Sequence, residues 1–159
     1  MITEIIYQGV LIGVIATIAI DLASLIVKHV FRLPTADWAM IGRWVSHIPR
    51  GVFIHESIAD SEEVKHERSI GWIAHYVTGV VYGLIYLGVV RGLLSADPTL
   101  TSALVFALVT LVVPWFIMQP GLGVGVCASK ASRPGVVRSI NVSMHVVFGL
   151  GLYAGWMLI

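Results

Sequence analysis

The stretch SIGWIAHYVTGVVYGLIYLGVV, residues 69–90, decides the fold class of this chain. It is long and apolar enough to cross a bilayer as a helix. Gly71, His75, Gly79 and Gly83 recur at every fourth position, so they share one face of that helix. A face of small residues lets a second helix approach closely. We therefore expect a membrane helix that packs through its glycines and carries His75 into the contact.

The composition places the whole chain in lipid. Of its 159 residues, 57% are hydrophobic and only 12% are charged, whereas about a quarter of the residues in a soluble domain are charged. The net charge of +1, with no basic run between aromatic residues, predicts no nucleic-acid partner. The single cysteine, Cys127, excludes an internal disulfide. The partner that we expect is the lipid bilayer.

Three further segments have the length and apolarity of membrane spans. With the first they predict an all-α membrane protein of four transmembrane helices in a bundle, and a single integral membrane domain over residues 1–159. We expect the spans at about residues 5–27, 69–90, 99–118 and 138–158. Pro114 should kink the third. Small residues line several helix faces, which is also compatible with a homo-oligomer.

Residues 28–68 form the one long polar connection. A short amphipathic helix is expected at roughly 36–47, with Trp38 and Trp44 on its apolar side, as is typical of a helix at the membrane interface. The run Asp60-Ser61-Glu62-Glu63 resembles a capping box, which predicts that the second long helix begins there, before it enters the membrane.

The positive charges predict the orientation in the membrane. The first loop holds six of the ten Lys and Arg residues, and the segment that enters the fourth span holds three. These are Lys28, Arg32, Arg43, Arg50, Lys65 and Arg68 in the loop, and Lys130, Arg133 and Arg138 in the segment. Since positive residues gather on the cytoplasmic side, we expect both connections and the amphipathic helix there, and both termini on the periplasmic side.

Polar residues of three helices fall at one depth. Asp21, His75 and His145 each lie six or seven residues from the cytoplasmic end of their span, which is about 10 Å at the rise of an α-helix. Gln119 ends the third span near this layer, and Asn141 lies one turn before His145. Ionisable side chains within a membrane are costly and usually face a partner or a cavity, so we expect these side chains to converge.

Three interpretations of this layer remain open. Two histidines on different helices, each one turn from a glycine, could ligate haem b, and a His-His-carboxylate set suits a divalent transition metal. A protonatable acid beside imidazoles also suits proton-coupled transport of an ion or small molecule. Finally, the polar contacts could serve only to hold the helices together. His47 and His55 in the loop are the additional ligands best placed to join the site.

No catalytic signature is present. His55-Glu56 and His66-Glu67 lack the second histidine of a zinc-protease helix motif, and Gly121, Gly123 and Gly125 follow a membrane helix where a nucleotide fingerprint would follow a strand. Whether the protein is an enzyme stays open.

Five segments carry a family resemblance over nearly the whole chain. They are ATIAIDL (16–22), IGRWVSHIPRG (41–51), GWIAHY (71–76), MQPGLG (118–123) and HVVFGLGLY (145–153). They resemble a family of small bacterial inner-membrane proteins known only as a domain of unknown function. The resemblance implies four membrane helices and a bacterial inner membrane, and it implies no activity. The segments include Asp21, His47, His75, Gln119 and His145.

Overall fold

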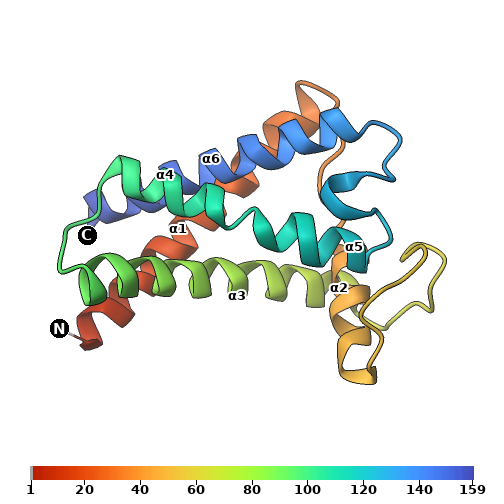
Figure 1. Cartoon of the computed structure of the whole chain (residues 1–159), viewed down its shortest axis with the longest axis horizontal. Coiled ribbons are helices and arrows are strands. Elements are labelled where there is room, and N and C mark those ends of the chain that lie inside the picture. Colours follow the sequence, from red (N-terminus) through yellow and green to blue (C-terminus); the bar gives the residue numbers. More distant parts are fainter. Residues whose placement is uncertain (1) are drawn as a thin grey trace. The chain divides into compact units, whose positions relative to one another are not determined.

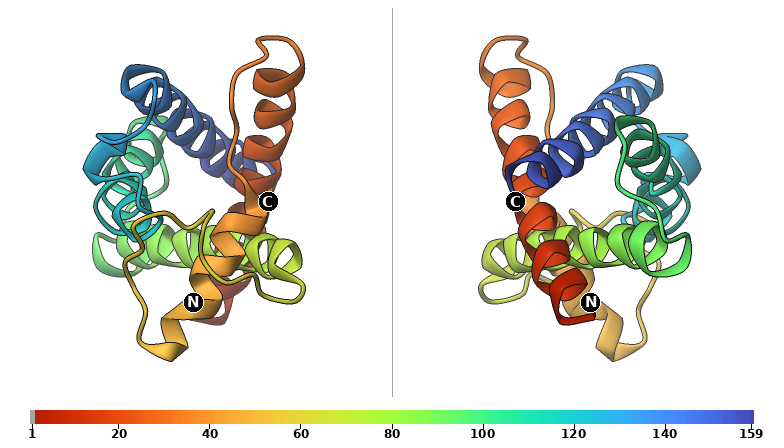
Figure 2. Two further views of the ribbon diagram at one scale, coloured as in Figure 1. Left: turned by 90° about the vertical axis from the view of Figure 1, so that its right-hand side faces the viewer. Right: turned by 90° about the vertical axis from the view of Figure 1, so that its left-hand side faces the viewer.

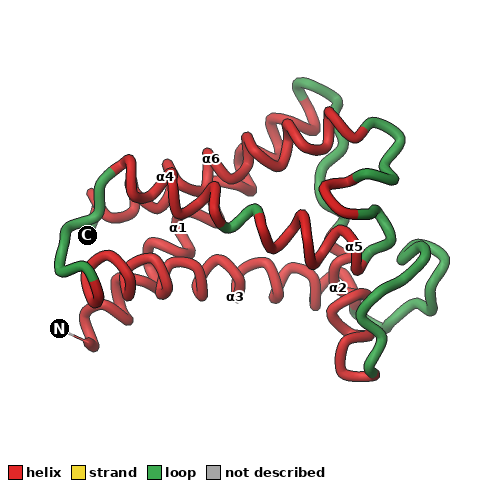
Figure 3. The backbone as a smooth tube through the Cα atoms, in the orientation of Figure 1, coloured by secondary structure: helices red, strands yellow, loops and turns green. Residues whose placement is uncertain are grey.

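A computed structural model describes residues 2–159, and this part of the chain contains helices and loops with no strand (Figure 3). Figure 1 shows the order of the elements. They are α1 (Ile2–His29), α2 (Trp38–His47), η1 (Ile48–Arg50), α3 (Glu67–Leu87), η2 (Gly88–Leu93), α4 (Leu100–Val109), η3 (Pro114–Met118), α5 (Gln119–Gly121), η4 (Val126–Ala128) and α6 (Pro134–Leu158). Both η2 and η3 are π-helical.

Four helical segments are long and apolar enough to cross a membrane. They are Ile2–His29, Glu67–Leu93, Leu100–Gly121 and Pro134–Leu158. In each of these helices, at most 28% of the most apolar 18-residue window is buried. Most of the apolar surface of the helices therefore faces outward, as it does in lipid. The predicted all-α fold with four spans is confirmed, and the chain has the character of a multi-pass membrane protein.

The chain divides into two compact units. The first contains the residues up to Leu33 together with Tyr76–Thr110 and Val142–Ile159, and the second contains Pro34–His75 and Leu111–Asn141. Each is described by itself below. The prediction of one integral domain stays a prediction.

In the first unit, α1 and α3 touch through their glycine faces. A methyl group added at Gly79 would collide with the hydroxyl of Thr17, and one at Gly83 would collide with the carbonyl oxygen of Gly9. Gly13 lies just as close to the backbone of Gly79. Only residues without a side chain allow backbones this near each other, so the four-residue glycine spacing does set this contact.

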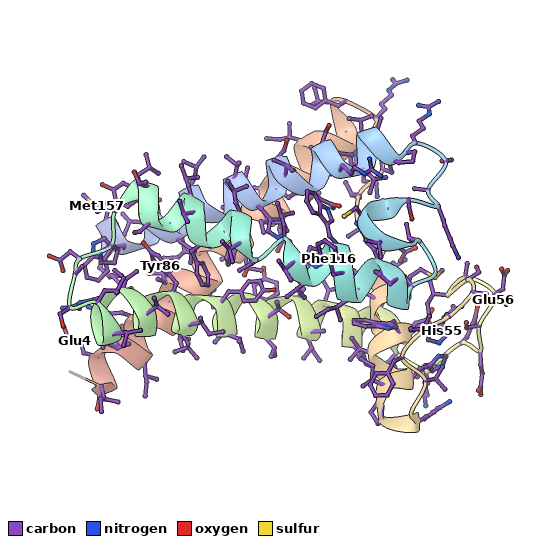
Figure 4. The ribbon with its side chains drawn as sticks, viewed as in Figure 1. Glu4, His55, Glu56, Tyr86, Phe116 and Met157 are labelled. Carbon is purple, nitrogen blue, oxygen red and sulfur yellow. The ribbon has the colours of Figure 1, made fainter. Side chains whose placement is uncertain are left out.

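The other helices of the first unit pack on the same core. Gly151 and Gly155 of α6 lie against Ala16 and Ile12 of α1 (Figure 2), while Gly149 lies against α4. Tyr86 reaches from α3 to α4 (Figure 4), where its hydroxyl pairs with that of Ser102 at 2.8 Å. The start of α1 and the end of α6 lie at the same end of this unit (Figure 1).

The third span is interrupted, as Pro114 predicts. The α-helical pattern of α4 ends at Val109, and π-helix η3 begins at Pro114, with the N–H of Gln119 bonded to the carbonyl of Pro114. Proline has no N–H to continue the α-helical ladder, and its ring clashes with the preceding turn. The span resumes as α5 after one wider turn.

In the second unit, α2 confirms the predicted short helix. Asp37 caps it by accepting a hydrogen bond from the N–H of Ala39 at 2.9 Å. Its backbone packs on the first turn of α3, because a methyl group at Gly42 would collide with the carbonyl of Glu67, and one at Gly71 with that of Trp38. The Gly71 end of the glycine face therefore receives α2.

The predicted start of the second long helix is wrong. The residues from Asp60 to His66 form turns and loop, and α3 begins at Glu67. The side chain of Glu67 accepts a hydrogen bond from the N–H of Val64 at 3.2 Å, while the hydroxyl of Ser61 bonds to the carbonyl of Ser57. The capping interaction thus comes from Glu67, seven positions after the first residue of the expected box.

Candidate functional site

Arg43 organises the polar half of the second unit. It is 2% exposed, and its guanidinium donates to both carboxylate oxygens of Glu67, at 2.8 and 3.0 Å. The other terminal nitrogen donates to three carbonyl oxygens of the loop, those of Ile58, Ala59 and Ser61, at 3.0 to 3.2 Å. The hydrogen bond that Arg43 donates to Glu67 is the main cause of a raised pKa for Arg43. A planar, five-donor cation thereby ties the loop to α2 and α3.

His47 lies one turn after Arg43 on α2 and pairs with His55. Nδ1 of His47 is 2.9 Å from Nε2 of His55, and the rings lie 5.1 Å apart between centroids. Nδ1 of His55 is 3.0 Å from the carbonyl oxygen of Gly121 in α5. Three segments distant in sequence are therefore joined by one chain of hydrogen bonds.

The backbone packs tightly around the hydrogen bonds that join His47, His55 and Gly121. The indole of Trp44 donates to the carbonyl of Phe53 at 2.9 Å, and a methyl group at Gly121 would collide with that indole. The N–H of His55 donates to the carbonyl of Gly121 at 3.0 Å. The position of His55 is thus fixed by its backbone as well as by its ring.

An open pocket lies beside this pair. Its volume is about 510 Å³, and it is lined by His55, Glu56, Ser57, Asp60 and Ser61. His55 and Glu56 both extend from the loop (Figure 4). The lining is polar and includes two acids, Glu56 and Asp60, so the pocket attracts water and cations beside His55.

Gln119 and Asn141 meet in the interior of the second unit. The side-chain oxygen of Asn141 accepts from Nε2 of Gln119 at 2.8 Å and from the indole of Trp115 at 3.2 Å. An indole can only donate, so Trp115 fixes which way the Asn141 amide points, and this in turn fixes Gln119. Oε1 of Gln119 is consequently turned elsewhere, and it is buried without a hydrogen-bond partner.

The acid of the first span is held by a phenol. In the first unit, the hydroxyl of Tyr76 on α3 donates to the carboxylate of Asp21 on α1 at 2.8 Å. Both side chains are half-buried. The carboxylate at this depth of a membrane span is therefore paired with a donor that carries no charge.

The two predicted membrane histidines belong to different units, and each is described within its own unit. His75, in the second unit, stacks on Trp38 at 4.2 Å between ring centroids and meets the edge of Trp72 at 5.9 Å. His145 is half-buried on α6 in the first unit. The structure therefore brings together Gln119 with Asn141 and His47 with His55, and it adds Tyr76 to Asp21.

The expected metal centre has no ligand set to support it. Within residues 2–159 there is no group of three or more His, Cys, Asp or Glu side chains placed to hold a metal ion. Of the predicted ligands, His47 and His55 are bonded ring to ring, which occupies one nitrogen of each. The convergence of Asp21, His75 and His145 on a shared centre stays a prediction.

Sequence reasoning missed Tyr76, Trp115 and the buried role of Arg43. Tyr76 directly follows His75, so its hydroxyl lies at about the depth of Asp21, and this position in the sequence could have identified it as a partner of that acid. The signal for Arg43 is weaker, since its partner Glu67 is 24 residues away.

A comparison with protein families matches residues 10–159 to the family described as a protein of unknown function, DUF2938. The chain belongs to this family. Neither the curated proteins nor the solved structures give a match. The match covers the segments that carry the resemblance seen in the sequence, so membership in DUF2938 is confirmed and it leaves the activity open.

Proposed function

We propose that this DUF2938 protein is a component of proton-coupled transport of an ion or small molecule, with Asp21 as the group that takes up and releases the proton. The observation that carries the proposal is the hydrogen bond of 2.8 Å from Tyr76 to the Asp21 carboxylate, made between two membrane spans. Ionisable residues at such depth are typical of proton and ion pathways.

The broken third span supports the same function. Irregular backbone at membrane depth is tolerated where it is covered by protein or lines a polar cavity, and interrupted helices commonly form the binding sites of transporters. Here the π-helical turn Pro114–Met118 leads directly into Gln119, whose side-chain oxygen Oε1 is buried without a hydrogen-bond partner. A buried acceptor of this kind suits a passing solute that donates a hydrogen bond or carries positive charge.

We further propose a bacterial inner-membrane location, with the loop from 28 to 68 in the cytoplasm and both termini in the periplasm. The support is the placement of nine of the ten Lys and Arg residues in two connections. Four spans enclose little space, so we also propose that two copies assemble in the membrane. A metal centre is the weaker alternative, because the residues that the structure describes offer no group of three metal-ligating side chains, while ligation of haem by His75 and His145 stays a prediction.

The first test measures proton uptake by Asp21 itself. In detergent-solubilised protein, infrared difference spectra between acidic and alkaline buffer should contain a carboxyl band that is lost in Asp21→Asn. The matched control is Asp97→Asn, which makes the same change at an exposed residue outside the spans. Spectra of Asp21→Asn that equal those of the wild type would overturn the proposal.

The second test measures flux. Wild-type protein in vesicles with a trapped pH dye should dissipate an imposed proton gradient, or do so once the cotransported solute is added. Asp21→Asn should reduce this rate at least about tenfold, as expected when the acid–base group of a proton transfer is removed. Asp97→Asn should transport at the wild-type rate.

A further inference from the structure

We propose that His55 and His47 form a proton relay, through which the buried interior of the second unit exchanges protons with the open pocket. The inference rests on the proposed proton-coupled function and adds the residues through which protons reach solvent. It is drawn from three features of the second unit: the direction of the hydrogen bonds, a bare buried nitrogen at one end and an acidic pocket at the other.

The carbonyl of Gly121 fixes the direction of the chain. A carbonyl oxygen only accepts hydrogen bonds, so Nδ1 of His55, at 3.0 Å, must carry a hydrogen. In neutral His55 the other nitrogen, Nε2, is then bare and accepts. Nδ1 of His47, at 2.9 Å, must therefore be the donor, and the neutral pair carries both of its hydrogens on Nδ1.

The chain of hydrogen bonds that runs from Gly121 through His55 ends at a buried lone pair of His47. With its hydrogen on Nδ1, neutral His47 has a bare Nε2. This atom is buried without a hydrogen-bond partner in a residue that is 6% exposed. Buried polar atoms without partners are rare in proteins and often mark a functional group. Because the opposite nitrogen donates to a neighbour, the ring is held in one orientation.

The His55 end of this chain of hydrogen bonds lies at a pocket that is open to water. His55 lines the pocket of about 510 Å³ together with Glu56 and Asp60, whose side chains are exposed. Exposed carboxylates exchange protons rapidly with water and raise the local concentration of cations. The pocket thus supplies both a proton donor and a proton acceptor beside His55.

The charged groups around the pair are otherwise neutralised. On α2 the nearest is Arg43, whose guanidinium is matched by the carboxylate of Glu67 from α3 at 2.8 Å and by that of Glu63 at 3.5 Å. The loop contributes Glu56 and Asp60 on the pocket side. The short helix α5 contributes the carbonyl of Gly121 and no charge. A positive charge on the histidine pair would therefore face acids, with the cation of Arg43 already paired with Glu67.

The transfer itself moves only protons. One proton binds Nε2 of His47 as the proton on Nδ1 of His47 passes to Nε2 of His55. His47 is then neutral with its hydrogen on Nε2, and His55 is an imidazolium that still donates to Gly121. His55 then gives the proton on its Nδ1 to water in the pocket, which breaks its hydrogen bond to the Gly121 carbonyl and leaves neutral His55 with its hydrogen on Nε2, and the same steps in reverse carry a proton inward. Ring rotation or exchange restores the starting tautomers.

Nitrogen-15 NMR of histidine-labelled protein in detergent tests the relay without any transport assay. Neutral His47 and His55 should both carry hydrogen on Nδ1, the less common tautomer, whereas exposed His66 in the same loop should show the usual Nε2–H form. Signals are assigned by single His→Gln substitutions. If neutral His47 carried its hydrogen on Nε2, the relay would be overturned, independently of the result for Asp21→Asn.

Flux measurements complete the test. His55→Asn keeps an amide donor for the Gly121 carbonyl but has no atom in the place of Nε2, so it should slow proton flux about tenfold or more. Added imidazole should restore much of that rate, which a purely structural role would not allow. His66→Gln is the control. Wild-type flux in His55→Asn and in His47→Gln would overturn the relay while leaving the role of Asp21 intact, and normal flux in Asp21→Asn would overturn the proposed function alone.

Discussion

The phenol of Tyr76 donates a hydrogen bond to the carboxylate of Asp21 over 2.8 Å, from α3 to α1. The two helices meet there just beyond the contact where Thr17 lies against Gly79. Glycine allows the backbones to come close, and the close approach lets a side chain of one helix reach an acid on the other. The position of a polar group in the membrane is thus set by the small residues beside it.

Tyr76→Phe should separate the structural from the functional role of this pair. A hydrogen bond to a charged group contributes about 1.5 to 3 kcal/mol, so the midpoint of thermal unfolding in detergent should fall modestly. Asp21→Asn keeps a partner for the phenol and should change the midpoint less while it abolishes proton uptake. If both variants lost stability equally and kept their flux, the pair would be purely structural.

Gly79→Ala should loosen the contact between α1 and α3. The added methyl group has no room beside the Thr17 hydroxyl, and overpacking of this kind costs about 1 to 3 kcal/mol. Gly88→Ala is the matched control, because a methyl group there would have nothing within 4 Å. Thermal unfolding followed by tryptophan fluorescence measures both. Equal midpoints for the two variants would contradict the assigned contact.

Arg43→Met should free the loop from 51 to 66. The substitution leaves Glu67 without its counterion, and breaking a buried ion pair costs about 3 to 5 kcal/mol. Limited proteolysis should cut the loop of the variant faster than that of the wild type. Arg50→Gln is the control: its pair with Glu62 is exposed, at 54% and 78%, and should contribute about 1 kcal/mol or less.

The pH dependence of the Arg43 contact follows from its raised pKa. A cation whose pKa is higher in the folded protein contributes stability that is fully present below its ordinary pKa and is lost only as the pH rises above it. Titration of Arg43 should therefore leave the loop closed throughout the physiological range. Proteolysis rates at neutral and at mildly alkaline pH should agree, and a steep rise between them would contradict this assignment.

Gln119 and Asn141 should respond in opposite ways to removal of their amides. Asn141→Leu leaves the donors of Trp115 and Gln119 without their shared acceptor, and each buried orphan costs about 1 to 3 kcal/mol. Gln119→Met removes a buried acceptor that has no partner and leaves Trp115 bonded to Asn141, so stability should hold or rise. Unfolding midpoints check both. Loss of flux in stable Gln119→Met would place Gln119 on the transport path.

The sequence predicts the fold well because lipid leaves few alternatives. Apolar length marks all four spans, and the spacing of Gly79 and Gly83 marks the face of α3 that receives a second helix, since backbone approach depends on where side chains are absent. Pro114 marks the break in the third span by local chemistry. The start of α3 is misplaced because the capping residue, Glu67, is held by a partner that lies far away in the sequence.

The candidate site is predicted only as a set of residue types. Depth along a helix places Gln119 and Asn141 near each other, and they do pair. It cannot show that His47 and His55 bond ring to ring, because that contact depends on how the loop folds back around Arg43. It also passes over Tyr76, whose phenol counts as apolar in a hydropathy pattern.

The π-helical turn at Pro114–Met118 carries one residue more than an α-helical turn would. Because the wider turn absorbs the extra residue, deleting one residue within it would let the third span run on as an ordinary α-helix, and Gln119 would keep its direction toward Asn141. A deletion in the α-helical stretch Leu100–Val109 has no wider turn to absorb it, and every later side chain would rotate by about 100° around the helix axis. The third span is therefore expected to tolerate the loss of one residue at its π turn and nowhere else along its length.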